Sequence, residues 1–296
     1  MAACRDATAS PPTASTAGIL RPEELAQHVD LVRRPAGTAV APWVENHWSL
    51  RWDLAEGQSF TSQVLPHPTC SLTVEVGYRR AGLPDGTSVF ITGVTTARFD
   101  VEIRDAGRVL GVRFRPGGLA ALTGQAATAW TDGVVPAADA LPSSLCATLA
   151  DADLVADVDG WLAEAEAGLV AMAADRGGEN ARYERLVAIV GDMLADRSLL
   201  SVADVAARHG VSVRTLQRLF THYVGIGPKW VLARYRMHDV VSAIDAGYEG
   251  TLTDLAHRFG WYDQAHFTRD FTTLVGVPPS AYRDGPTPAR SRGGGR

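Results

Sequence analysis

Two short stretches in the C-terminal third carry side chains that can hydrogen-bond to base edges and hold phosphate groups. The first stretch contains Arg214, Thr215, Gln217 and Arg218. The second contains Gln264, Ala265, His266, Thr268 and Arg269. Arginine, glutamine and threonine are among the side chains that read base edges in the major groove or contact the phosphate backbone. Both stretches are therefore candidate nucleic-acid recognition surfaces.

Apolar residues within the two stretches recur at the spacing of an α-helix. Leu216, Leu219 and Phe220 recur in the first, and Phe267 and Phe271 in the second. An apolar stripe of this period faces a core and leaves the polar residues between on the outer face. We therefore expect two amphipathic helices that present their donors to solvent, with Ser212 and Asp263 as N-caps.

Each of these helices is preceded by another helix, and the pair is repeated along the chain. Residues 201–210 match residues 251–260, with Asp, Ala, Arg and Gly at equivalent places. Ser201 and Thr251 are N-cap candidates, and the Asp three residues after each forms a variant of the capping box. Each first helix ends at a glycine, which permits the tight turn that follows. The sequence thus predicts two helix-turn-helix units.

The run from about Tyr183 to Arg283 resembles the two-unit DNA-binding domain of the AraC/XylS family. The resemblance rests on residues 214–220 (RTLQRLF) and the closing residues 276–283 (GVPPSAYR). It implies that a long helix, here from Pro228 or Lys229 to Ala246 with Gly247 as its stop, joins the units. It also implies that the two recognition helices enter successive major-groove segments roughly 34 Å apart.

The second unit differs from the family pattern at its turn. The family more often has Gly-Phe followed by a small serine, whereas this chain has Gly260, Trp261, Tyr262 and Asp263. Trp261 can take the place of the phenylalanine. The larger Tyr262 and His266 affect the base preference of this half-site and not the fold.

The charge of the chain is divided between its two ends. The whole chain carries a net charge of −5, which is unfavourable for binding a polyanion. Residues 1–179 hold 13 arginines against 22 acidic residues, whereas residues 201–296 hold 12 basic residues against 8 acidic ones. The C-terminal part is therefore the part suited to meet DNA.

The N-terminal half has the period of two that indicates half-buried strands. The alternation occurs within residues 44–52, 72–78, 99–103 and 110–114, with Gly and Pro turns between them. Helical patterns follow at 119–122, 145–149 and 155–174. The fold class is therefore α+β, with a small antiparallel sheet or barrel domain (19–175) before an all-α domain (181–283). Residues 1–18 and 284–296 are expected to be disordered, and 176–180 to be a linker.

Two segments of the first half, residues 90–94 and 109–119, resemble an uncharacterised sensory domain that precedes this DNA-binding module in bacterial regulators. The resemblance covers about residues 30–140 and implies effector sensing or self-association. Trp43, Trp48 and Trp52 are candidates to line an effector pocket, although core packing also accounts for them. Residues 113–118 suit a strand-end turn better than an anion site, because they lack the ending of a P-loop. His47, His67 and Cys70 lack the spacing of a metal site.

We therefore expect a cytoplasmic, sequence-specific DNA-binding transcription regulator, activator or repressor, without cofactor, metal or membrane association. Its expected partners are a double-stranded DNA operator, a small organic effector, RNA polymerase if it activates, and a second copy in a homodimer. The alternative is a ligand-independent regulator whose N-terminal domain only dimerises. An enzyme is not expected. DNA-repair proteins with a similar module need four zinc-binding cysteines and a Pro-Cys-His-Arg motif, whereas this chain has Cys4, Cys70 and Cys146.

Overall fold

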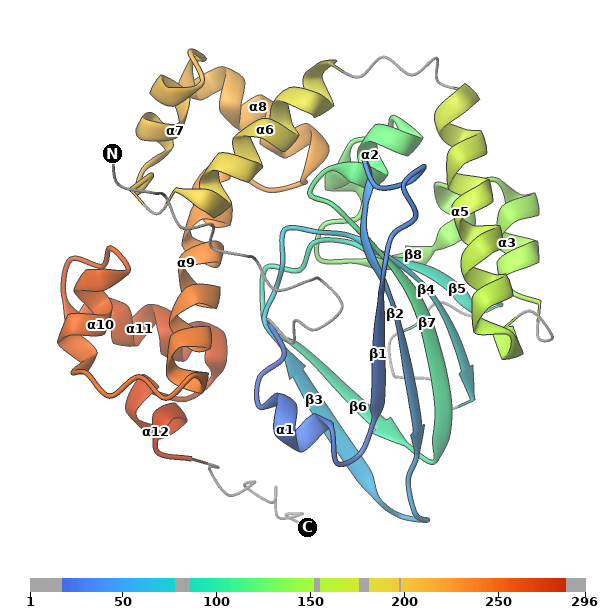
Figure 1. Ribbon diagram of the computed structural model, residues 1–296, viewed down its shortest axis with the longest axis horizontal. Coiled ribbons are helices and arrows are strands. Elements are labelled where there is room, and N and C mark those ends of the chain that lie inside the picture. The colour runs from blue at the N-terminus through green and yellow to red at the C-terminus, as the bar shows by residue number, and fades with distance from the viewer. Residues whose placement is uncertain are drawn as a thin grey trace, which may run out of the picture. The chain divides into compact units, whose positions relative to one another are not determined.

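The computed structural model describes residues 18–77, 83, 86–151, 155–175, 181–196 and 198–285. The chain forms two compact units, Met1–Leu232 and Ala233–Arg296. The first unit contains the antiparallel sheets and the first helix-turn-helix pair, and the second contains the second pair (Figure 1). The α+β class, with its sheet domain and its two helical pairs joined by a long helix, is thereby confirmed.

The division between the units falls inside the joining helix, α9 (Pro228–Asp245). The predicted linker at 176–180 lies outside the described residues, as do nearly all of the two ends predicted to be disordered. The predicted domain boundary at 176–180 stays a prediction.

Two antiparallel sheets form the core of the first unit. The larger has the strand order β1-β2-β7-β4-β5-β8, and the smaller pairs β3 with β6. The strands are β1 (Asp30–Pro35), β2 (Val44–Asp53), β3 (Ser59–Val64), β4 (Ser71–Gly77), β5 (Val89–Thr92), β6 (Phe99–Arg104), β7 (Ala106–Phe114) and β8 (Val134–Pro136). The four alternating segments predicted from the sequence lie in β2, β4, β6 and β7, although Tyr78 is outside the described residues.

Short helices complete this part of the chain. They are α1 (Pro22–Leu25), α2 (Gly118–Thr123), the 3-10 turns η1 (Ala127–Ala129) and η2 (Ala137–Asp139), α3 (Ser143–Leu149) and α5 (Val158–Asp175). Trp161 on α5 is fully buried, and its Nε1 donates to the carbonyl of Leu149 at 3.0 Å. Helix α5 is tied to β2 through Glu166, whose Oε1 lies 2.7 Å from Nε2 of buried His47 and accepts from the amide of Gly37 at 2.7 Å.

The C-terminal helices follow the sequence repeat. They are α6 (Ala181–Ala195), α7 (Val202–Arg208), α8 (Val213–Tyr223), α9, α10 (Leu252–Arg258), α11 (Gln264–Val275) and α12 (Pro279–Arg283). Helix α9 begins at Pro228 and stops just before Gly247, which has a φ of +81°. Its bounds agree with the joining helix that the sequence predicts.

The first helix pair packs against the sheet domain within the first unit. The hydroxyl of Tyr183 on α6 donates to the carbonyl of Pro42 at 2.8 Å, and Oγ1 of Thr131 donates to that of Gly225 at 3.2 Å. A Cβ added to Gly117, before α2, would meet Leu186 and Tyr223 of the helical part. The sheet domain and the first helix pair therefore share a close-packed contact.

Removing the Tyr183 hydroxyl tests this contact. Burial raises the pKa of Tyr183, with nearby Arg115 opposing the rise, so the phenol stays protonated and donates. We expect Tyr183→Phe to lower the free energy of unfolding of the first unit by about 1 kcal/mol, because the Pro42 carbonyl loses its donor. Denaturant titration measures the change. Tyr262→Phe, which alters a side chain 88% exposed, is the matched control and should have no effect.

Candidate nucleic-acid interface

The first helix-turn-helix pair is fixed by caps at both helix starts. Ser201 and Asp204 form a reciprocal capping box, with Oγ of Ser201 accepting from the Asp204 amide at 3.2 Å and the carboxylate accepting from the Ser201 amide at 2.9 Å. Gly210 ends the first helix with a φ of +59°. Ser212 caps α8 by accepting from the Thr215 amide at 3.1 Å. These predicted caps are all present, and they fix where α8 starts.

Helix α8 buries one face and exposes the other. Leu216 and Phe220 are fully buried, while Arg214, Thr215, Gln217 and Arg218 are all exposed. Within the described residues, the side chains of Arg214, Gln217 and Arg218 form no hydrogen bond or ion pair with the protein. Thr215 differs, because its Oγ1 lies 2.9 Å from Oγ of Ser212. The outer face of α8 thus presents three long donor side chains that are not engaged by the protein.

The second pair repeats the N-caps around an aromatic core, but not the predicted capping box: Oγ1 of Thr251 accepts from the Asp254 amide at 3.1 Å, and the described structure lacks the return bond from the Thr251 amide. Asp263 caps α11 by accepting from the His266 amide at 2.7 Å, and Gly260 has a φ of +82°. Phe267 is fully buried, with its ring centroid 5.3 Å from that of Trp261 and 5.7 Å from that of Phe271. Edge-to-face packing of this kind adds to the burial of the rings. Trp261 therefore packs in the aromatic core, as expected of a residue that takes the place of the phenylalanine of the family pattern.

The outer face of α11 is more engaged by the protein than that of α8. Gln264, Ala265, His266 and Arg269 are exposed, whereas Thr268 is only half-exposed. Oε1 of Gln264 accepts from Oγ1 of Thr253 at 2.7 Å, which leaves the amide nitrogen to donate outward. Nε2 of His266 lies 3.2 Å from the carboxylate of Asp270. Helix α11 therefore offers fewer unengaged donors than α8. Its engaged side chains, Gln264 and His266, are held in place by their partners.

Two further residues lie near this helix: Arg236, which the sequence did not mark, and Tyr262, which the sequence marked by its departure from the family pattern. Arg236 on α9 donates to the carbonyl of Gly260 at 3.2 Å, and its guanidinium lies 5.3 Å from the centroid of the Trp261 ring. The pKa of Arg236 is lowered by burial, and Asp270 opposes the effect. Arg236 therefore positions the turn. Tyr262, in that turn, is 88% exposed beside the start of α11. Its departure from the family pattern is the sequence feature that marks Tyr262 as a candidate site residue.

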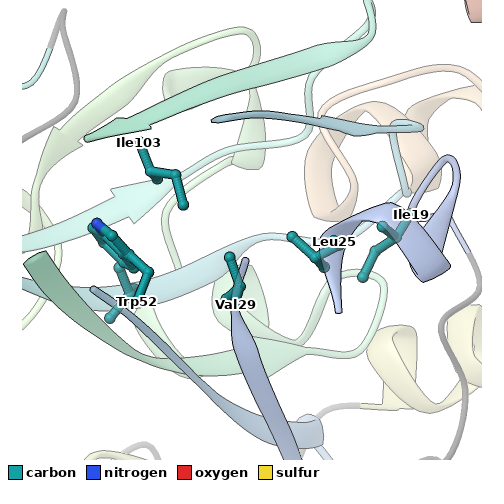
Figure 2. Close-up of a cluster of buried hydrophobic side chains, with 6 residues drawn as sticks. Ile19, Leu25, Val29, Trp52 and Ile103 are labelled. Atoms are coloured by element: carbon teal, nitrogen blue, oxygen red, sulfur yellow. The ribbon is translucent and has the colours of Figure 1, made fainter. Parts of the chain in front are cut away.

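The tryptophans predicted to line an effector pocket are only partly brought together. A cavity of about 240 Å³ lies within the sheet domain, and Trp48 and Trp52 line it. Trp43, just before β2, is not among the described residues of its wall. Figure 2 shows Trp52 with Ile19, Leu25, Val29 and Ile103, all of which belong to this wall.

In the described ranges, no group of three or more His, Cys, Asp or Glu side chains is placed to hold a metal ion. Burial raises the pKa of the Cys70 thiol to about 12, with a backbone hydrogen bond opposing it.

Of the helices in the described part of the chain, none combines the length and apolar character needed to cross a membrane.

Two consecutive capped helix pairs, each with an amphipathic second helix, define a double helix-turn-helix domain. Residues 192–285 match the family described as "Helix-turn-helix domain", and this part of the chain is a helix-turn-helix domain. Residues 33–136 match the family described as "Domain of unknown function (DUF6597)". The helix-turn-helix prediction for the C-terminal part is thereby confirmed, and the first half is confirmed as an uncharacterised domain, whose sensory role stays a prediction.

A Streptomyces lividans protein named as an AraC-like transcription regulator is 34% identical over 87 residues, which are 29% of this chain and 28% of that protein. The chain thus matches less than a third of its curated relative's length. Among solved structures, the C-terminal domain of the response regulator AraT from Geobacillus stearothermophilus is 23% identical, with a TM-score of 0.33 and coverage of 36% of this chain and 89% of that one. ToxT from Vibrio cholerae is 11% identical, with a TM-score of 0.37 and coverage of 86% and 97%.

Proposed function

We propose that the protein is a bacterial, cytoplasmic transcription regulator that binds DNA sequence-specifically through α8 and α11. The observation that carries this proposal is the outer face of α8, where Arg214, Gln217 and Arg218 are exposed and not engaged by the protein. Arginine and glutamine make the bidentate contacts that distinguish guanine and adenine in the major groove. A rigid, capped helix that presents them suits base reading.

Base reading fits these faces better than contact with the phosphate backbone alone. A protein that holds only phosphates needs many Lys and Arg side chains on its binding face. Here the faces of α8 and α11 also carry Gln217, Gln264 and Thr268. Glutamine and threonine bind base edges without adding charge, so their presence favours sequence-specific binding.

We propose that the sheet domain modulates this binding. It packs directly against α6 through Tyr183 and against the loop after α8 through Thr131, so a ligand that shifts the sheet domain can alter the position of α8. The proposed partners are a small organic effector, a second copy of the chain in a homodimer and, for an activator, RNA polymerase. A regulator whose sheet domain only dimerises is the alternative, and it predicts no effect of any small molecule on DNA affinity.

The salt dependence of binding tests the proposed DNA contact. Each phosphate that the protein neutralises gives a slope of about −0.9 in the logarithm of affinity against the logarithm of salt. A fourfold rise in salt should therefore weaken binding to a selected operator by about 3.5-fold per phosphate contact. Fluorescence anisotropy with a labelled duplex measures this slope. A slope near zero would contradict binding through Arg214, Arg218 and Arg269.

A further inference from the structure

The cavity of the sheet domain has an apolar end and a basic end. Its wall is built by consecutive rows of residues that lie opposite one another across the larger sheet. One row contains Leu31, Leu50, Val109 and, at its end, Glu75, and the next contains Arg33, Trp48, Gly111 and Thr73. Since residues two apart on a strand share a face, Arg113 lies on the same wall beyond Gly111. The wall therefore passes from aliphatic side chains to two arginines.

The indoles are held flat against this wall by two glycines of β7. A Cβ on Gly111 would collide with the Trp48 ring, and a Cβ on Gly107 would collide with the Trp52 ring. Any other residue at these positions would push the indoles into the cavity. The cavity of about 240 Å³ is kept open by this arrangement, and it exceeds the volume of about 150 Å³ that admits benzene.

The basic end has more positive than negative charge. Nε of Arg113 lies 3.1 Å from Oε2 of Glu45 but is buried without an aligned hydrogen-bond acceptor among the described residues. The guanidinium of Arg33 forms no hydrogen bond or ion pair within the same part of the chain. Burial and the charge of Arg113 lower the pKa of Arg33 to about 10, while Glu45 opposes them. Two cations thus share one carboxylate at this end.

Two further groups define the ligand that would complement this end. Oγ1 of Thr73 is buried in the cavity wall and has no hydrogen-bond partner in the described structure. An anion beside Arg33 could accept from this hydroxyl, and buried polar groups are normally satisfied in this way. Glu75 lies opposite Val109, toward the apolar end of the wall, and is itself buried. Its carboxylate would repel a second negative charge on the ligand.

We propose that this cavity binds a small aromatic monocarboxylic acid, with its ring against Trp48, Trp52 and the aliphatic side chains and its carboxylate at Arg33 and Arg113. The volume suits one benzene ring with a short acid chain, and the indoles favour an aromatic body. The inference rests on the proposed function, since it names the chemical class of the effector. It involves no chemical change in the ligand.

The probe for the test is 3-phenylpropanoate, compared with the uncharged 3-phenylpropanamide of nearly the same shape. Each is titrated into the full chain without DNA, with tryptophan fluorescence and calorimetry as readouts. His67 also lines the cavity, so the titrations are run at pH 8, above the usual range of imidazole. We expect the acid to bind at least about tenfold more tightly than the amide, because hydrogen bonds to charged groups are the stronger ones.

Three variants separate the basic end from the apolar one. Arg33→Gln should reduce the preference for the acid and leave the affinity for the amide unchanged. Val101→Phe, in the apolar wall, should weaken both ligands alike by filling the cavity. Arg51→Gln is the matched control. Arg51 is exposed and lies between Leu50 and Trp52, which both line the cavity. Because successive residues of a strand point to opposite faces, the Arg51 side chain points away from the cavity. Circular dichroism of each variant establishes that it is folded.

Equal affinity for acid and amide, or an acid preference that Arg33→Gln leaves undiminished in a folded protein, would overturn the inference. So would the absence of saturable binding at millimolar concentrations of 3-phenylpropanoate. Because the titrations contain no DNA, none of these results bears on the proposed regulator. Loss of DNA binding in a separate anisotropy assay would reject the regulator and leave the ligand site unaffected.

Discussion

Phe267→Ala is expected to lower the free energy of unfolding of the second unit by about 3–5 kcal/mol. Phe267 is fully buried between Trp261 and Phe271, so truncation removes two ring contacts and leaves a cavity. The unit Ala233–Arg296 is small, and small units have little stability in reserve. Denaturant titration followed by circular dichroism measures the loss, and limited proteolysis locates it between α10 and α12.

Tyr262→Ala is the matched control for this experiment, because it removes an aromatic ring of similar size that is 88% exposed. Exposed substitutions usually change stability by no more than about 0.5 kcal/mol. If Phe267→Ala and Tyr262→Ala had the same effect on unfolding, the aromatic core described for the second helix pair would be wrong.

The double variant Arg214→Ala with Gln217→Ala is expected to relax base preference in one half-site. Both side chains are exposed on α8 and not engaged by the described protein, so the fold should be unchanged. Each lost bidentate contact should cost about 1–3 kcal/mol of discrimination at the base that it reads. Anisotropy titrations against a set of operators with single base changes measure this discrimination.

Arg182→Ala is the control for the charge that the double variant removes, because Arg182 is exposed on α6 rather than on α8. It should leave base preference unchanged. If the double variant weakened every operator equally, Arg214 and Gln217 would hold phosphates and would not read bases.

The sequence predicted the DNA-binding domain closely because its signals are local. N-caps act within three residues, as Ser212 and Asp263 do, and helical periodicity separates buried Phe220 from exposed Gln217 without reference to the rest of the chain. The exceptions are Thr268, which was expected on the outer face and is only half-exposed, and Thr251, whose predicted capping box with Asp254 is one-sided in the described structure.

The sheet domain was predicted less completely because its strands depend on their partners. Strand β1 contains two successive arginines and is mostly exposed, so its sequence lacks a clear alternation. Strands β5 and β8 are short, with four and three residues. The cavity brings β1, β2, β4 and β7 together across long separations in sequence, and nothing local marks Arg33 as its basic end.

The packing of the first helix pair against the sheet domain was not foreseen from the sequence. Charge and composition divide the chain near residue 176, whereas Tyr183 and Thr131 form contacts between the parts on either side. Such contacts arise from the tertiary fold and leave no periodic pattern.

Selection of binding sites from a random DNA library with the full chain tests the proposal of a sequence-specific regulator most directly. Two recognition helices that enter successive major-groove segments predict an enriched motif with two half-sites about 10–10.5 base pairs apart. The Arg214→Ala, Gln217→Ala variant should lose enrichment in one half-site and retain the other. If the folded protein bound DNA but enriched no motif, sequence-specific recognition by α8 and α11 would be contradicted.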